Sequence, residues 1–121
     1  GDHRDLHSFP TLRSSDLLAS YLDNADMKKA RENYLQIAEH LSKTEFNKGY
    51  SKAINGIVTS MEKNDRDSII CKIVSKEIEK RDLKKLLLES TKRASESFRT
   101  DEEKGFETAW TDILSIYIER S

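Results

Sequence analysis

His40 is a candidate metal ligand with carboxylates nearby. Glu39 precedes it, and Glu32 and Glu45 lie within about two helical turns. A carboxylate site on paired helices uses the pattern Glu-x-x-His, which places both ligands on one helix face. Ile37 stands where that pattern needs a glutamate. We therefore expect no metal and no cofactor.

Cys71 is the single cysteine and the other reactive side chain. A cysteine nucleophile needs a base such as histidine nearby, and the apolar stretch Ile69–Val74 offers none, so an inert buried thiol is the default interpretation. One cysteine also excludes an intrachain disulfide and a cysteine metal site. We expect no enzyme activity. Such cysteine usage fits a reducing compartment, so we expect a cytoplasmic location.

A basic stretch runs from Lys76 to Arg93. It holds seven cations and four acids, a net charge of +3, whereas Glu96–Arg120 has a net charge of −4. A cationic face can contact phosphates, but interleaved acids are typical of solvated faces that attract each other within a bundle. The whole chain has a net charge of −1, which does not favour nucleic acid as a partner. The candidate basic face consists of Lys76, Lys80, Arg81, Lys84 and Lys85.

Two segments share one pattern. Residues 48–58 and 104–114 both read Lys-Gly-aromatic-x-x-Ala-apolar-x-x-Ile-aliphatic. Glycine inside a helix costs about 1 kcal/mol relative to alanine, so such glycines suggest a packing reason. Gly49, Ala53 and Gly56 lie near one another on a helix and form a candidate face of small residues. This face predicts close packing within the chain, which is the commoner case, or the docking of a partner helix.

Three aromatic residues in the second segment and beyond it, Phe106, Trp110 and Tyr117, have the spacing of one helix face. They could floor a ligand pocket. At this spacing such residues are more often part of the core.

The composition favours helices that each bury one face. Hydrophobic and charged residues each make up 36% of the chain, which contains only four Gly and one Pro among 121 residues. This length suits one domain. No run approaches the roughly 18 apolar residues that a membrane span requires.

Apolar residues at steps of three and four predict the helices. The stripes run over residues 27–41, 46–61 and 106–117. Ser42 with Glu45, and Thr100 with Glu103, match capping boxes.

Between these stripes, residues 67–97 predict two shorter helices with a bend or loop between Ser75 and Asp82, and Asp65 or Asp67 as the first cap. One continuous helix over 67–97 is an alternative, and a short strand over 69–74 is another.

The expected fold is all-α, an antiparallel bundle of four to five helices. Gly49 and Gly105 lie 56 positions apart, so the bundle is either a duplicated helical hairpin or contains two amphipathic helices that are similar by chance. A partial tetratricopeptide-like spacing also occurs, although no 34-residue period follows. It involves Leu17, Tyr21, Ala30 and Tyr34.

The N-terminal residues lack helical periodicity. The run Arg4 to Thr11, followed by Arg13 to Leu17, resembles the conceptual translation of a short-read sequencing adapter, with Leu12 where that translation usually has Arg. The resemblance implies that 1–17 is a non-native tail from assembled environmental (metagenomic) DNA, and a genuine disordered tail is the alternative. Residues 18–121 then form a single helical domain. From Lys28 onward the chain resembles small helical proteins of prokaryotes in general, without a specific family.

Together these patterns predict a non-enzymatic helical module for protein interaction or self-association. Its partner would be another protein or a second copy, with no membrane and no metal. The alternative is a nucleic-acid-associated protein that uses the Lys76–Arg93 basic face.

Overall fold

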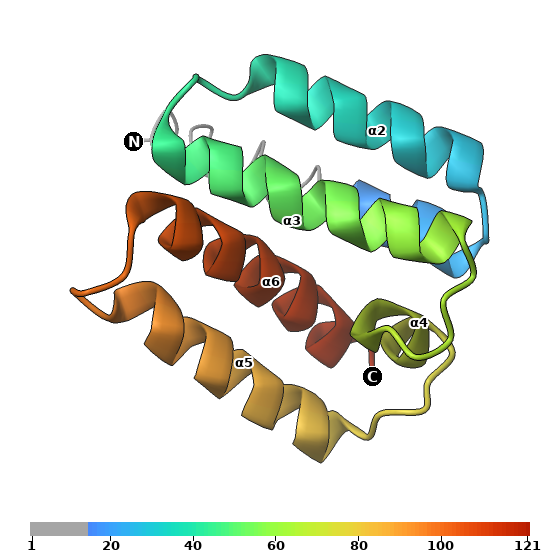
Figure 1. Cartoon of the computed structure of the whole chain (residues 1–121). Helices are drawn as coiled ribbons and strands as arrows, with labels where there is room; N and C mark the ends of the chain where they lie inside the picture. The colour runs from blue at the N-terminus through green and yellow to red at the C-terminus, as the bar shows by residue number, and fades with distance from the viewer. Residues whose placement is uncertain (1–14) are drawn as a thin grey trace, which may run out of the picture.

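The computed structural model describes residues 15–121, and every regular element in this part of the chain is a helix (Figure 1). The expected all-α fold is confirmed, with six helices where four to five were predicted. No strand forms over 69–74. The elements are an N-terminal helical segment (residues 15–23), α2 (Met27–His40), α3 (Glu45–Glu62), α4 (Ile69–Val74), α5 (Lys80–Ser95) and α6 (Asp101–Arg120).

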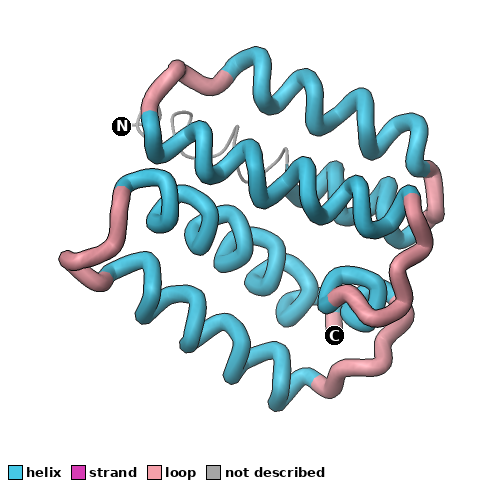
Figure 2. The backbone as a smooth tube through the Cα atoms, in the orientation of Figure 1, coloured by secondary structure: helices cyan, strands magenta, loops and turns pink. Residues whose placement is uncertain are grey.

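Four helices lie side by side in the order α2, α3, α6, α5 (Figure 1). Each outer helix forms an antiparallel hairpin with its inner neighbour, whereas the inner helices α3 and α6 run parallel. Figure 2 shows that the loop between α2 and α3 and the loop between α5 and α6 lie at the same end of the helices. The N-terminal helical segment lies behind α3 in this view, and α4 packs against α3.

Glycines explain the close approach of α3 and α6. A Cβ on Gly49 would overlap the backbone carbonyl of Glu102, and a Cβ on Gly105 would overlap that of Phe46. The two contacts are reciprocal, because 46 and 102, like 49 and 105, are 56 positions apart. The hairpins α2–α3 and α5–α6 are therefore related by an approximate twofold arrangement, as a duplicated hairpin predicts.

The helix starts confirm some predicted caps and correct others. The capping box of Thr100 and Glu103 is present at α6. The box of Ser42 and Glu45 is wrong, because α3 begins after Thr44, whose side chain accepts a hydrogen bond from the amide of Asn47. Thr44 and Thr100 are again 56 positions apart.

The cap of α4 is Ser68, not Asp65 or Asp67, because its Oγ accepts a hydrogen bond from the amide of Cys71. The side chain of Asp65 instead bonds the amide of Asp67 within the preceding turn.

Three helices end on a residue with positive φ that is not glycine: Ala25 (56°), Asn64 (53°) and Lys76 (63°). At each, the next residue donates its amide hydrogen to a carbonyl five positions back, the pattern of a Schellman cap. The cap at Lys76 separates α4 from α5. The predicted break between 75 and 82 is thus confirmed, and a continuous helix over 67–97 is wrong.

The core lies on both sides of the α3–α6 pair and includes the N-terminal helical segment. The N-terminal helical segment already includes 15–17, three positions before the predicted start of the helical domain, and Ser15 is buried. The rest of the predicted tail, 1–14, lies outside the described residues. The largest completely buried apolar side chains are Leu18, Leu22, Ile54, Ile57, Val58, Ile70, Ile113 and Leu114.

Candidate functional site

The three small residues of the predicted face have different environments. Gly49 is buried against the backbone of Glu102 on α6, so packing within the chain accounts for it. Ala53 is buried as well and lines the same hollow as Gly56. Gly56 is exposed, and a Cβ there would meet no atom within 4 Å. The structure therefore assigns no packing reason to the glycine at 56.

Gly56 lies in an apolar groove. A hollow of about 210 Å³ lies between α3, α4 and α6. Phe106 and Ile69 at its wall are 36% and 45% exposed, and Trp110 is half-buried beside them. We call the surface formed by Gly56, Ile69, Phe106 and Trp110 the Phe106 groove.

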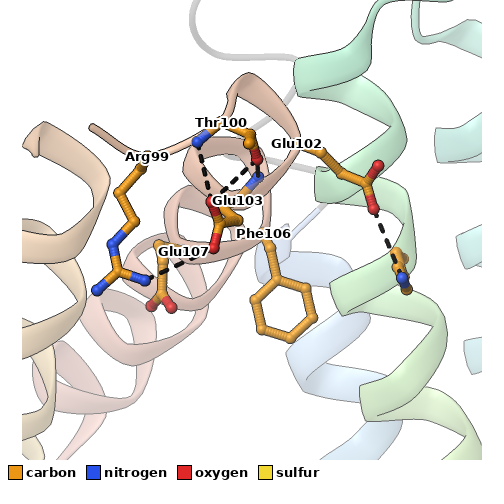
Figure 3. A pocket seen from close by; sticks show the side chains of 7 residues that line it. Arg99, Thr100, Glu102, Glu103, Phe106 and Glu107 are labelled. Atoms are coloured by element: carbon orange, nitrogen blue, oxygen red, sulfur yellow. Dashed lines mark hydrogen bonds and ion pairs between the residues drawn. The ribbon is translucent and has the colours of Figure 1, made fainter. Parts of the chain in front are cut away.

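Phe106 also lines a second hollow of about 420 Å³ toward the start of α6. Figure 3 shows its ring between the ribbons of α6 and α3. Around it the side chains are charged: Lys52 lies 3.5 Å from Glu102, and Arg99 lies 3.7 Å from Glu103. Hydrogen bonds from Thr100 hold the pKa of Glu103 below its usual value. The groove thus has an apolar part near α4 and a charged end.

The opposite side of the α3–α6 pair is closed. The hydroxyl of Tyr50 donates a 2.6 Å hydrogen bond to Asp112, and Ser15 of the N-terminal helical segment lies 3.4 Å from that hydroxyl. Burial raises the pKa of both Tyr50 and Asp112. These groups are packed in the interior and serve to hold the N-terminal helical segment in place.

The two sides use equivalent positions. Phe106 stands 56 positions after Tyr50, and Asp112 stands 56 positions after Gly56. Where one side has a hydrogen-bonded Tyr–Asp pair, the other has phenylalanine beside glycine. Gly56 and Phe106 line the groove together with residues of α4. The offset of 56 positions and the change of residue types at these positions are visible in the sequence.

The predicted aromatic face is divided. Phe106 and Trp110 line the groove, but Tyr117 is buried on the opposite side, where its hydroxyl donates a 2.9 Å hydrogen bond to Asp23. Burial raises the pKa of Tyr117. A pocket lined by all three residues does not form, because Phe106 and Trp110 lie on one side of the row of helices and Tyr117 lies on the other.

The predicted basic face is also divided. Lys76 ends α4 and lies in a different hollow, beside Tyr117 and Arg120. Lys80, Arg81, Lys84 and Lys85 lie on α5, which packs against α6.

The helical rotation of about 100° per residue places the cations and the acids of α5 at different angles around the helix. Within about 60° of Leu88 every charged residue is a cation, whereas Asp82 and Glu89 fall at about 100–120°. We call this surface the α5 face. It consists of Arg81, Lys84, Lys85, Leu88 and Lys92.

Only one cation of α5 bonds to α6. Arg93 lies 3.0 Å from Glu107 on the inner side. Arg81 has two contacts of 3.8 Å, to Glu79 and Asp82. Within residues 15–121, Lys84 and Lys85 form no ion pair. The expectation that the basic and acidic stretches neutralise each other therefore holds for Arg93 and fails for the outer lysines.

Neither of the reactive side chains noted in the sequence lies in a cluster of catalytic or metal-ligating groups among residues 15–121. The imidazole of His40 is exposed, with Nδ1 2.8 Å from the carbonyl oxygen of Gln36. The thiol of Cys71 is half-buried, 3.5 Å from the sulfur of Met61. Among residues 15–121 no group of three or more His, Cys, Asp or Glu side chains is placed to hold a metal ion.

No protein-family model, curated protein or solved structure matches this chain. None of the helices in the described part of the chain combines the length and apolar character needed to cross a membrane.

Proposed function

We propose that this chain is a non-enzymatic helical module that binds an apolar segment of another protein, or of a second copy of itself, in the Phe106 groove. The observation that carries the proposal is Gly56. A glycine inside a helix costs about 1 kcal/mol relative to alanine, and no neighbouring atom requires it here. Its missing side chain leaves the groove open beside Phe106 and Trp110.

The dimensions support an apolar anchor. The hollow of about 210 Å³ is larger than the roughly 150 Å³ cavity that accepts benzene in an engineered protein. It has room for one large side chain such as leucine or phenylalanine. Partly exposed aromatic residues beside such a hollow are typical of binding hot spots.

The equivalent side of the molecule supports a helical occupant. There the N-terminal helical segment covers the α3–α6 pair with Leu18 and Leu22, which are completely buried. Binding of a short amphipathic helix in a groove is a common mode of peptide recognition. The Phe106 groove would accept such a helix in trans.

Two measurements test the proposal. Sedimentation velocity over a range of concentrations reports self-association. Selection from a displayed library of helical peptides reports a foreign partner, with Trp110 fluorescence as the binding signal. We expect either self-association or peptide binding, and we expect Gly56→Leu to abolish it because leucine fills the groove. The control Gly56→Ser, at the same position, should retain it. A monomer that selects no peptide sensitive to Gly56→Leu contradicts the proposal.

A second candidate function is nucleic-acid association through the α5 face. Its support is that Lys84 and Lys85 are exposed and form no ion pair within the described residues. Binding would weaken steeply with salt, because phosphate contacts release counterions. Titration of labelled DNA and RNA at two salt concentrations, with Lys80, Lys84 and Lys85 changed to Gln, tests this candidate.

For the compartment we keep the cytoplasm as part of the proposal, supported by the unpaired thiol of Cys71. Fractionation of cells that express the full natural gene tests it.

A further inference from the structure

The α5 face combines charge with an exposed apolar residue. Leu88 is 70% exposed at its centre, and only Phe98, in the loop after α5, is exposed to a similar degree among large apolar residues of 15–121. A single exposed leucine is ordinary. A leucine beside Lys84, Lys85 and Lys92, none of which forms an ion pair within residues 15–121, is a more specific arrangement.

The arrangement follows from the helix register. Lys84 and Lys85 lie one turn before Leu88, and Lys92 lies one turn after it. From Arg81 to Lys92 the face extends about 17 Å along the helix, or about three turns. Four cations therefore lie within about 60° of Leu88 around the helix, whereas the acids Asp82 and Glu89 lie at about 100–120°.

We propose that the α5 face is a docking surface for an acidic helical segment of another protein, one that carries a leucine-sized side chain flanked by carboxylates. Carboxylates would pair with Lys84, Lys85 and Lys92, and the apolar side chain would cover Leu88. This inference is independent of the Phe106 groove, because it rests on a different helix and on different residues.

Charge complementarity selects this occupant over nucleic acid. A phosphate backbone would satisfy the cations but would leave Leu88 against charged groups, with no apolar surface to cover it. An acidic amphipathic segment satisfies both, since electrostatic steering promotes the encounter and the buried apolar contact slows dissociation.

The matched control is the outer helix of the other hairpin. On α2, Leu35 is 55% exposed, and its neighbours at the same helical offsets are Lys28, Arg31, Glu32 and Glu39. That surface is balanced in charge. A partner chosen by the cations of α5 should not bind there.

The test uses the full chain and a fluorescein-labelled synthetic helical peptide with one leucine flanked by glutamates at i−4, i+3 and i+4. A control peptide has the same sequence with serine in place of that leucine. We expect saturable binding that weakens about tenfold in Lys84→Gln/Lys85→Gln and about fivefold in Leu88→Ser. The control peptide with serine should bind the unaltered chain more weakly than the leucine peptide by a similar factor. Leu35→Ser, Lys28→Gln/Lys29→Gln and Gly56→Leu should change the affinity less than about twofold.

Four results would overturn the proposal. The first is no saturable peptide binding, and the second is binding indifferent to Leu88→Ser. The third is tighter binding of DNA or RNA 20-mers than of the peptide, which assigns the face to nucleic acid. The fourth is self-association that is lost in the α5 variants, which assigns the face to a second copy. Circular dichroism of each variant separates loss of binding from loss of fold.

Discussion

The two sides of the α3–α6 pair differ although their positions correspond. One side has Tyr50 bonded to Asp112 and is covered by the N-terminal helical segment. The other has Phe106 beside Gly56 and is covered in part by α4, so that a groove remains. Corresponding positions thus carry a buried Tyr–Asp pair on one face and phenylalanine beside glycine on the other, and a different helical segment covers each face. Burial of a polar pair holds a neighbouring segment, whereas an aromatic residue beside glycine leaves a hollow.

The outer helices show the same contrast. On α2, Arg31 is bound by Glu62 at 2.6 Å, and its guanidinium also contacts Thr59 on α3. This pairing raises the pKa of Arg31 and lowers that of Glu62. On α5, Lys84 lies four positions before the exposed Leu88, as Arg31 lies four positions before the exposed Leu35. Lys84 has no such partner among residues 15–121. Arg31 thus joins the helices of the first hairpin, and Arg93 joins those of the second through Glu107, whereas Lys84 and Lys85 are exposed to solvent.

The largest expected effect comes from the glycines between the hairpins. Gly49→Ala or Gly105→Ala places a methyl group on a backbone carbonyl, so α3 and α6 must separate. We expect a loss of about 3 kcal/mol in the free energy of unfolding, measured with urea. Gly56→Ala, which meets no atom, should instead gain up to about 1 kcal/mol. Equal effects at 49 and 56 would contradict the close-approach assignment.

The next effect concerns the closed side and depends on pH. Burial raises the pKa of Tyr50 and Tyr117 above the ordinary value, so the folded state keeps both protons where the unfolded state releases them. Their stabilising contribution is complete below pH about 10 and is lost as pH rises above it. Tyr50→Phe should cost about 1–2 kcal/mol at neutral pH and flatten the alkaline loss. Urea unfolding at several pH values checks this, and an unchanged alkaline slope would contradict it.

A smaller effect compares the outer helices. Arg31→Gln removes the contacts that join α2 to α3 and should lower the melting temperature by a few degrees. Lys84→Gln on α5 should leave it unchanged, because no intramolecular contact is lost. Differential scanning calorimetry compares the two. A similar decrease in both variants would show that α5 also uses its lysines internally.

The smallest effect compares the ends of the two short helices. Ala25 ends the N-terminal helical segment and Lys76 ends α4, both with positive φ. Glycine adopts this conformation without the steric cost of a Cβ. Ala25→Gly and Lys76→Gly should each stabilise by about 0.5–1 kcal/mol in thermal or urea unfolding. Destabilisation at Lys76 alone would show that its side chain contributes contacts of its own.

Much of the fold was predictable from local patterns. The steps of three and four located α2, α3 and α6, and Thr100 with Glu103 specified the start of α6. The boundary of the tail was less predictable, because residues 15 and 16 contact residues far away in sequence, such as Arg120, which pairs with Asp16 across 104 positions. The adapter resemblance of 1–17 and the prokaryotic origin stay predictions.

The sequence by itself determined the all-α class, the glycine-led repeat and the inventory of charges, because these depend on residue types and on neighbours one helical turn away. Only the tertiary structure decided that Gly49 is packed and Gly56 is open, since both are glycines on one helix and differ in what lies opposite. It also decided which cations of the basic stretch remain without a partner. In sequence, acids interrupt that stretch, but the register and packing of α5 turn Arg93 toward Glu107 and leave Lys84 and Lys85 in solvent.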